Sequence, residues 1–384
     1  MSEFDYYIRQ GEPSQRERAE AWAVAIGLQD VDGLKTSQFL RDTAKRHIEG
    51  EIDIKSAQTL VHSYYQSKTA RTPDSDEQYE ADSVAAKITE LIESNTLGFS
   101  LQGYIGIHRH LFTGIYKFAG QIRDYNITKK EWVLRGDTVS YLNYADIRPA
   151  IEYDLEKERL FSYKGLSPYE MIAHIAQFVS GLWQIHAFGE GNTRTTAVFT
   201  ILYLRSIGFN VDNTLFADHS WYFRNALVRA NYKNAQQGID YDYQYLEVFF
   251  RNLLLGETNE LKNRYLIINP PAELQHTTPA STPSSTPTST PSSTQTNTPT
   301  SSLNIELSEP VRRLVLAIGE QQLSKKDIMA AVGLKDRVNF EEYSLTPAIN
   351  AGIVQALYPN SPRHPRQKYI LSVKGLMLLQ SLQQ

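Results

Sequence analysis

Apolar residues recur at helical spacing along most of the chain, and this pattern predicts a mainly α-helical protein. Residues 14–67 and the stretch that begins at residue 82 show it first, with charged residues on the opposite positions. We therefore expect helices there that bury one face and expose the other. Residues 217–255 repeat the pattern, and the polar stretch 68–82 predicts a loop.

The most apolar predicted helix spans residues 168–185. Ser167 suits the N-cap, Pro168 suits the first turn, and Glu170 completes a capping box. Apolar residues then occupy nearly every face, which is typical of a helix at the centre of its domain. A second apolar helix follows and ends at Gly208. Side chains on the short segment between the two helices would be held by a rigid support at each end.

Three regions depart from this pattern. Residues 124–144 place β-branched and aromatic residues on both sides of a Gly-Asp pair at 136–137, which predicts a β-hairpin. Residues 271–302 consist mainly of Pro, Ser and Thr and predict an extended linker, because they bury too little apolar surface to offset the entropy of ordering. Residues 303–384 show three helical segments and then two alternating runs, the order of a winged helix-turn-helix domain.

The composition narrows the class of protein. The chain has 384 residues, 41% of them hydrophobic, and its apolar runs are too short to predict a membrane-spanning helix. It contains no cysteine, which excludes disulfides and thiolate metal sites. Its first residues are polar rather than typical of a secretory signal, so we expect a cytoplasmic protein. The net charge of −4 leaves only local patches for binding nucleic acid.

The candidate chemistry lies between the two apolar helices. His186 is a candidate general base, Glu190 a candidate metal ligand, and Arg194 a fixed cation. Glycines at 189 and 191 would let the backbone approach a phosphate, and the amides that begin the following helix would point toward it. A histidine alone is more often structural, but these groups within nine positions favour a nucleotide-phosphate site.

The segment resembles the Fic family signature, His-Pro-Phe-x-Asp/Glu-Gly-Asn-Gly/Lys-Arg-x-x-Arg. Six informative positions match: His186, Phe188, Glu190, Gly191, Asn192 and Arg194. Ala187, Thr193 and Ala197 depart from it, and Ala197 replaces the second arginine. The resemblance implies a mainly α fold: a Fic-type helical bundle with a β-hairpin flap, plus the small winged helix-turn-helix domain. The expected domains are a helical module at 1–67, a Fic core at 82–257, the linker at 271–302 and the winged helix at 303–384.

The resemblance also implies an activity, protein adenylylation, in which AMP passes from ATP to a Ser, Thr or Tyr hydroxyl of a target protein. His186 would take the hydroxyl proton, Glu190 would hold Mg²⁺, and Arg194 would clamp the leaving phosphates. The nucleotide-binding positions would be Phe188, Gly189, Gly191, Asn192, Thr193, Arg194, Tyr222 and Asn231. Trp132 and Val133 would lie on the flap that aligns the target.

An inhibitory element is expected in the first module. Residues 46–51 resemble the Glu-Gly end of the Fic inhibitory motif, with Glu49 as the inhibitory residue and Lys45 in place of its Ser or Thr. In the family this glutamate pairs with the second arginine, which is Ala197 here. Inhibition by Glu49 would therefore work differently, for example through Arg194. Without the second arginine, either ATP would bind more loosely or a basic residue such as Lys45 or Arg46 would take its place.

Several alternatives stay open at this level. Glu49 could position water for removal of AMP, the donor could be another nucleotide or phosphocholine, or the protein could be a non-catalytic nucleotide sensor. Four basic residues near the predicted hairpin tip suit phosphate contact: Arg363, His364, Arg366 and Lys368. Glu341 and Glu342 on the preceding helix argue against reading a DNA groove, so DNA and a protein partner both remain for 303–384. Dimerisation also stays open.

Overall fold

The computed structural model describes residues 3–67, 73–209, 211, 214–269 and 307–383. Helices dominate these ranges, and their β-structure is one two-stranded sheet with two isolated bridges, so the mainly α prediction is confirmed. The predicted linker at 271–302 lies outside the described residues. Within the described part, no helix combines the length and the apolar character needed to cross a bilayer.

The N-terminal helices pack directly on the rest of the chain. They are α1 (Asp5–Gln10), α2 (Pro13–Gly27), the 3₁₀ turn η1 (Leu28–Asp32), α3 (Gln38–Ile48), α4 (Ile54–Gln66) and α5 (Pro73–Ser94). Helix α2 lies against α5 and α10 and buries Trp22 completely. At its end, the Gly27 carbonyl accepts a hydrogen bond of 2.8 Å from the Ser220 hydroxyl. The first module is thus continuous with the core.

Helix α5 corrects one sequence prediction. It begins at Pro73, so residues 73–82, expected to be loop, are helical. Proline suits the first turn of a helix, and Asp74 and Asp76 follow it there, where their negative charge favours the positive end of the helix dipole. These two features outweigh the low hydrophobicity of the segment.

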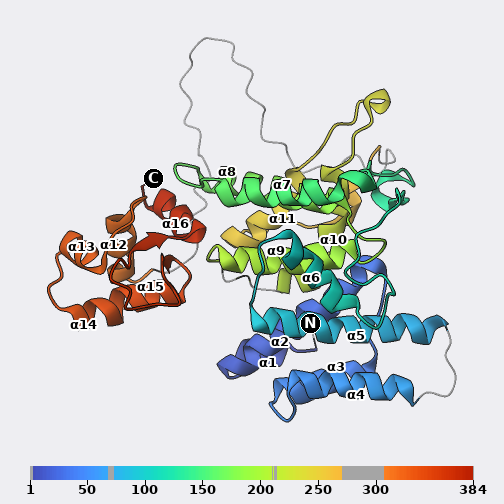
Figure 1. Cartoon of the computed structure of the whole chain (residues 1–384), viewed down its shortest axis with the longest axis horizontal. Coiled ribbons are helices and arrows are strands. Elements are labelled where there is room, and N and C mark those ends of the chain that lie inside the picture. Colours follow the sequence, from blue (N-terminus) through green and yellow to red (C-terminus); the bar gives the residue numbers. More distant parts are fainter. Residues whose placement is uncertain (1–2, 68–72, 210, 212–213, 270–306, 384) are drawn as a thin grey trace.

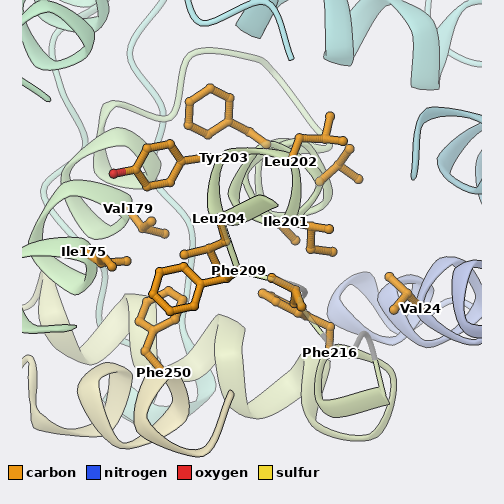
Figure 2. Close-up of a cluster of buried hydrophobic side chains, with 14 of the residues drawn as sticks. Val24, Ile175, Val179, Ile201, Leu202, Tyr203, Leu204, Phe209, Phe216 and Phe250 are labelled. Atoms are coloured by element: carbon orange, nitrogen blue, oxygen red, sulfur yellow. The ribbon is translucent and has the colours of Figure 1, made fainter. Parts of the chain in front are cut away.

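The centre of the molecule is formed by six helices. They are α6 (Leu101–Phe112), α7 (Ile147–Leu160), α8 (Pro168–Ile185), α9 (Asn192–Ser206), α10 (Thr214–Ala230) and α11 (Gln244–Leu255). Short 3₁₀ turns lie at η3 (Tyr144–Asp146), η4 (Ala235–Gln237) and η5 (Asn263–Leu266). Helix α8 begins with the predicted capping box of Ser167 and Glu170. Figure 2 shows the end of α9 and Phe209 packed among residues of α2, α8, α10 and α11.

The predicted hairpin at 124–144 does not form. This segment is irregular apart from η2 (Trp132–Leu134) and the start of η3. The Glu131 and Gly136 amides bond across a tight turn, to Asp137 and Glu131 respectively, rather than along a strand ladder. Val133, Leu134 and Val139 are buried, so the apolar residues that suggested strands anchor the loop in the core instead.

The C-terminal region has the predicted order of elements. The helices are α12 (Glu309–Ile318), α13 (Lys325–Ala331), α14 (Arg337–Phe340), the π turn η7 (Glu341–Leu345) and α15 (Thr346–Asn350). Strands β1 (Val354–Ala356) and β2 (Tyr369–Leu371) pair antiparallel, with Val354 opposite Leu371, and α16 (Val373–Gln383) ends the fold. Figure 1 shows these elements as one cluster, and α16 packs against α8.

Candidate active site

The candidate base His186 and the candidate metal ligand Glu190 lie on one loop, residues 186–191, between α8 and α9; we call it the motif loop. His186 ends α8 in the left-handed conformation, with φ 50° and ψ 60°. This backbone turn brings the chain from one central helix to the next within six residues. The guanidinium of Arg123 holds the turn, because its Nε donates to the His186 carbonyl at 2.7 Å.

Arg123 also joins the motif loop to the irregular segment 121–143. Its other nitrogens donate to the carbonyls of Tyr125, Leu142 and Ile185, and its own amide donates to the Ala187 carbonyl at 2.9 Å. A buried arginine that donates to four carbonyls positions the loops around it. The sequence pattern alone gave no signal for this role of Arg123.

The His186 ring is held as a neutral base. Its Nδ1 lies 3.3 Å from the Trp183 carbonyl, which only accepts, so Nδ1 carries the proton and Nε2 keeps its lone pair. Nε2 is buried and has no hydrogen-bond partner among the described residues. Burial, with the charge of Lys129, holds the pKa of His186 well below its usual value. The Tyr141 ring packs at a tilt against the His186 ring, with centroids 4.1 Å apart, and its hydroxyl donates to Glu131 at 3.0 Å.

The start of α9 is shaped to approach a ligand. Gly191 precedes the helix with φ 76°, and no side chain caps the first amides. A β-carbon at Gly191 would lie 2.4 Å from the Phe112 ring, and one at Gly189 would lie 2.8 Å from the Tyr125 hydroxyl. Uncapped amides at a helix N-terminus form a site for anions. This geometry suits the predicted approach of a phosphate, which stays a prediction.

Asn192 and Thr193 hold this end of α9 rather than facing solvent. Asn192 is 3% exposed, accepts from the Phe188 amide at 2.9 Å and donates to the Phe188 carbonyl at 2.7 Å. The Thr193 hydroxyl accepts from the Trp183 indole at 3.0 Å. Their side chains thus fix the shape of the motif loop, and only their backbone amides remain for a phosphate.

His108 braces the motif loop from α6. Its ring stacks on Phe188 with centroids 3.8 Å apart. Nδ1 accepts from the Gly120 amide at 2.9 Å, so Nε2 carries the proton and donates to the Glu190 carbonyl at 3.0 Å. Burial lowers the pKa of His108 to about 4, which keeps this arrangement neutral. These contacts give His108 a structural role.

Glu190 is the exposed acid of the loop. Its side chain is 54% exposed, and its carboxylate pairs with the Lys129 ammonium at 2.8 Å. Lys129 belongs to the irregular segment, so that segment reaches the motif loop from the solvent side. No cluster of three or more metal-ligating side chains occurs within the described ranges. A single exposed carboxylate still suits Mg²⁺, which is commonly held by one or two carboxylates together with substrate phosphates.

Arg194 is surrounded by acceptors from other parts of the chain. It is 1% exposed, its Nε lies 2.7 Å from Asp32, and an Nη lies 2.7 Å from Glu80. Gln29 and Tyr116 approach at 3.2 and 3.3 Å. Burial alone would lower the pKa of Arg194, and the two carboxylates outweigh it and raise the pKa. The four residues Gln29, Asp32, Glu80 and Tyr116 form what we call the Arg194 cage.

Glu49 is not part of this cage. Its carboxylate accepts a hydrogen bond from the Tyr7 hydroxyl near the start of the chain. Lys45 pairs with Glu3 at 2.6 Å, and Arg46 pairs with Glu51 at 3.2 Å. The structure therefore does not bring the predicted inhibitory glutamate, or the predicted replacement cations, to the motif loop. The acids at Arg194 were missed because they lie far away in sequence.

Of the remaining predicted positions, Trp132 is exposed, whereas Val133, Tyr222 and Asn231 contact the core. Trp132 is 51% exposed, but Val133 is fully buried, and its carbonyl accepts a hydrogen bond from the Ile268 amide. Val133 therefore cannot contact a target protein. Tyr222 is 2% exposed, and the Asn231 amide donates to the hydroxyl of Ser180 on α8 at 2.8 Å. Their core contacts account for both residues, and a nucleotide role for them stays a prediction.

Comparison with known proteins adds two family matches. Residues 98–204, which include α6 and the motif loop, match the Fic/DOC family. Residues 309–372 match the family described as the C-terminal domain of "Filamentation induced by cAMP protein Fic-like". The second match covers α12 through β2.

Individual relatives are more distant. A stretch of 117 residues, 30% of this chain, is 29% identical to Protein adenylyltransferase VbhT of Bartonella schoenbuchensis (strain DSM 13525 / NCTC 13165 / R1), and it spans 23% of that protein. Among solved structures, a Fic family protein from Desulfovibrio desulfuricans G20 aligns over 96% of this chain and 90% of its own, with 16% identity and a TM-score of 0.39.

Proposed function

This chain carries a Fic/DOC family domain, and from that premise we propose that it is a protein adenylyltransferase with ATP as donor. The observation that carries the proposal is the state of His186: a buried neutral imidazole with a lone pair on Nε2, beside the uncapped N-terminus of α9. The name of the relative from Bartonella schoenbuchensis supports the same reaction class.

In the proposed reaction, the oxygen of a target Ser, Thr or Tyr hydroxyl forms a bond to the α-phosphorus of ATP. The bond from that phosphorus to the bridging oxygen breaks, and pyrophosphate leaves. The hydroxyl proton passes to Nε2 of His186, which is free to accept it. The amides that begin α9 stabilise the negative charge that develops on the α-phosphate.

Glu190 and Lys129 complete the proposed site. Glu190 would hold Mg²⁺, which would neutralise charge on the phosphates when bound. The Lys129 ammonium, now 2.8 Å from that carboxylate, would supply a further cation to the phosphates. Ala197 itself is fully buried in α9, so the side chain at that position does not reach a ligand.

We further propose that the Arg194 cage restrains the enzyme. Arg194 would clamp the leaving pyrophosphate, but its guanidinium is occupied by Asp32 and Glu80. Asp32 belongs to the N-terminal module, from which inhibition is expected. We therefore propose Asp32 and Glu80, rather than Glu49, as the inhibitory residues. Removal of AMP by Glu49 is not proposed, since that carboxylate is bound to Tyr7.

The test is transfer of label to protein. Purified protein and a cell extract would be incubated with Mg²⁺ and ATP labelled at either the α- or the γ-phosphate. We expect label from α-labelled ATP alone, because γ-label leaves with pyrophosphate. His186→Ala should reduce labelling by about 10²- to 10⁴-fold, the usual contribution of a general base.

His62→Ala is the matched control, since His62 is an exposed histidine of α4. Equal labelling by His186→Ala and wild type would refute the proposed role of His186. Label from γ-labelled ATP would indicate phosphorylation instead. No label with wild type or with variants of the Arg194 cage would refute the activity and favour a nucleotide sensor. Homodimerisation and the identity of the target stay predictions that these assays leave open.

A further inference from the structure

A cavity of about 760 Å³ lies in the C-terminal region, far along the chain from the motif loop. Its walls come from α13, from the turn between α13 and α14, and from the loop that joins β1 and β2. Six of its twelve lining residues are basic, and we call this set the basic cleft: Lys325, Lys326, Lys335, Arg337, Arg363 and His364.

The positive charge of the basic cleft is only partly compensated. No acidic residue lines the cavity. Glu341, beside it, pairs with Lys325 at 2.7 Å and with Arg337 at 2.8 Å. Lys326, Lys335 and Arg363 are exposed, and none of them has an ion pair with another described residue. Lys326 interacts electrostatically with its neighbour Asp327, outside the lining. Three cations without an ion pair to a described residue, on three separate segments around one cavity, favour a ligand with several negative charges.

We propose that the basic cleft binds the phosphate backbone of double-stranded DNA without reading its sequence. The order of three helical segments followed by a hairpin supports a nucleic-acid ligand, since helix-turn-helix domains place such elements against a duplex. Sequence-specific reading is not part of the proposal. Glu341 and Glu342 occupy the third helical segment, and carboxylates there would repel the backbone on either side of a groove.

Two other ligands fit the cleft less well. Single-stranded nucleic acid is normally held by aromatic faces on which bases stack, but Tyr369, the only aromatic ring besides His364 in the lining, is 6% exposed. The His364 ring is itself stacked on Tyr358, with centroids 3.8 Å apart. An acidic peptide would match the charge alone, whereas a duplex also presents phosphates at a fixed spacing to cations on separate segments.

The experiment uses the full chain and a fluorescent duplex of mixed sequence, with binding measured by anisotropy over a range of salt concentrations. The test variant is Lys326→Ala/Lys335→Ala/Arg363→Ala. The control variant, Lys35→Ala/Arg312→Ala/Lys157→Ala, removes three exposed cations elsewhere and has the same net charge. Neither set of residues lies in the proposed catalytic site. The rate of adenylyl transfer therefore checks that each variant is folded, separately from its binding to the duplex.

We expect wild type and the control to bind the duplex alike, with affinity falling as salt rises. In the test variant, the slope of log K against log salt concentration should be less steep by about three, roughly one for each lost phosphate contact. The proposal fails if the test variant binds as well as the control, or if wild type does not bind the duplex. It also fails if an unpaired strand or a poly-glutamate peptide of equal charge binds more tightly. The result does not depend on the transferase activity.

Discussion

At the residue scale, the carboxylates around Arg194 both order its guanidinium and occupy the donors that a phosphate would need. A buried guanidinium needs acceptors for its donors, and the Arg194 cage supplies Asp32 and Glu80 at 2.7 Å each. Either carboxylate would compete with a phosphate for the same donors. The cage therefore stabilises the fold and hinders binding of the phosphate by Arg194. Removing one acid should lower stability but raise activity.

We expect Asp32→Asn and Glu80→Gln each to increase adenylyl transfer and to lower the melting temperature. A hydrogen bond to a charged group contributes about 1.5–3 kcal/mol, so losing the one from Arg194 to Glu80 should raise activity on the order of tenfold. The Asp32 carboxylate forms an ion pair with Arg194 without a hydrogen bond, so we expect a smaller rise for Asp32→Asn. Initial rates of α-label transfer and thermal melts would measure both changes.

Glu49→Gln is the control for the cage, because it alters an acid that contacts Tyr7 instead of Arg194. It should leave the rate of transfer unchanged. A rise in activity with Glu49→Gln, and none with the other two variants, would restore the inhibitory role to Glu49 and exclude the cage as the restraint.

At the scale of elements, α9 determines where the chemistry lies. Its first turn carries the uncapped amides, and every residue from Asn192 to Leu204 is buried. The helix can begin where it does because Gly191 adopts φ 76° against the ring of Phe112 on α6. The position of the motif loop therefore depends on contact between two helices.

Gly191→Ala tests this contact. A left-handed alanine costs about 1–2 kcal/mol, and a β-carbon 2.4 Å from Phe112 adds an overpacking cost of about 1–3 kcal/mol. We expect a loss of roughly 2–5 kcal/mol in the free energy of unfolding, measured by urea denaturation, together with loss of ATP binding.

Gly238→Ala is the matched control, since Gly238 has φ 67° and no atom within 4 Å of the added β-carbon. It should show only the backbone cost, about 1–2 kcal/mol. Equal destabilisation by the two variants would mean that the approach of Phe112 does not limit residue 191.

At the scale of the whole molecule, the helical core contacts the C-terminal elements at the C-terminal end of α9. Gly208 and Gly352 approach so closely that a β-carbon on either would lie 2.2 Å from the carbonyl oxygen of the other. The Gln355 amide donates to the Ser206 carbonyl at 3.0 Å, and the Gly165 amide donates to Glu320 at 3.0 Å. The C-terminal elements are thus packed on the core in this structure, which Figure 1 shows beside α8.

Gly208→Ala should separate these two parts. Its φ of 101° and the carbonyl of Gly352 both oppose a side chain, so the junction must move by more than a few tenths of an ångström. We expect faster amide hydrogen exchange in β1, β2 and α16, with little change around the motif loop.

Gly256→Ala is the control for this junction, because Gly256 also has a positive φ, 71°, and no neighbour within 4 Å. It should leave exchange in β1, β2 and α16 unchanged. Unaltered exchange in Gly208→Ala would show that the glycine contact does not hold the two parts together.

Local patterns were sufficient for much of this protein. Helical periodicity, the Ser167–Glu170 capping box and the glycines of the motif loop act over a few residues, so they predicted α8, α9 and the loop between them. The predicted order of elements in the C-terminal region also appears in the structure, because each element is bounded by its own caps and glycines.

The sequence by itself therefore determined the mainly helical character of the fold, the two helices that flank the motif loop and the order of elements in the C-terminal region. Only the tertiary structure decided which groups meet. Asp32 and Glu80 reach Arg194 across 162 and 114 positions, and no local pattern encodes such a pairing. The segment 124–144 has strand-forming residues, but burial of Val133 and Leu134 against the core outweighed that propensity. Contacts between distant segments determine which groups are buried together. Burial therefore decided both the pairing of Arg194 with its two acids and the irregular conformation of residues 124–144.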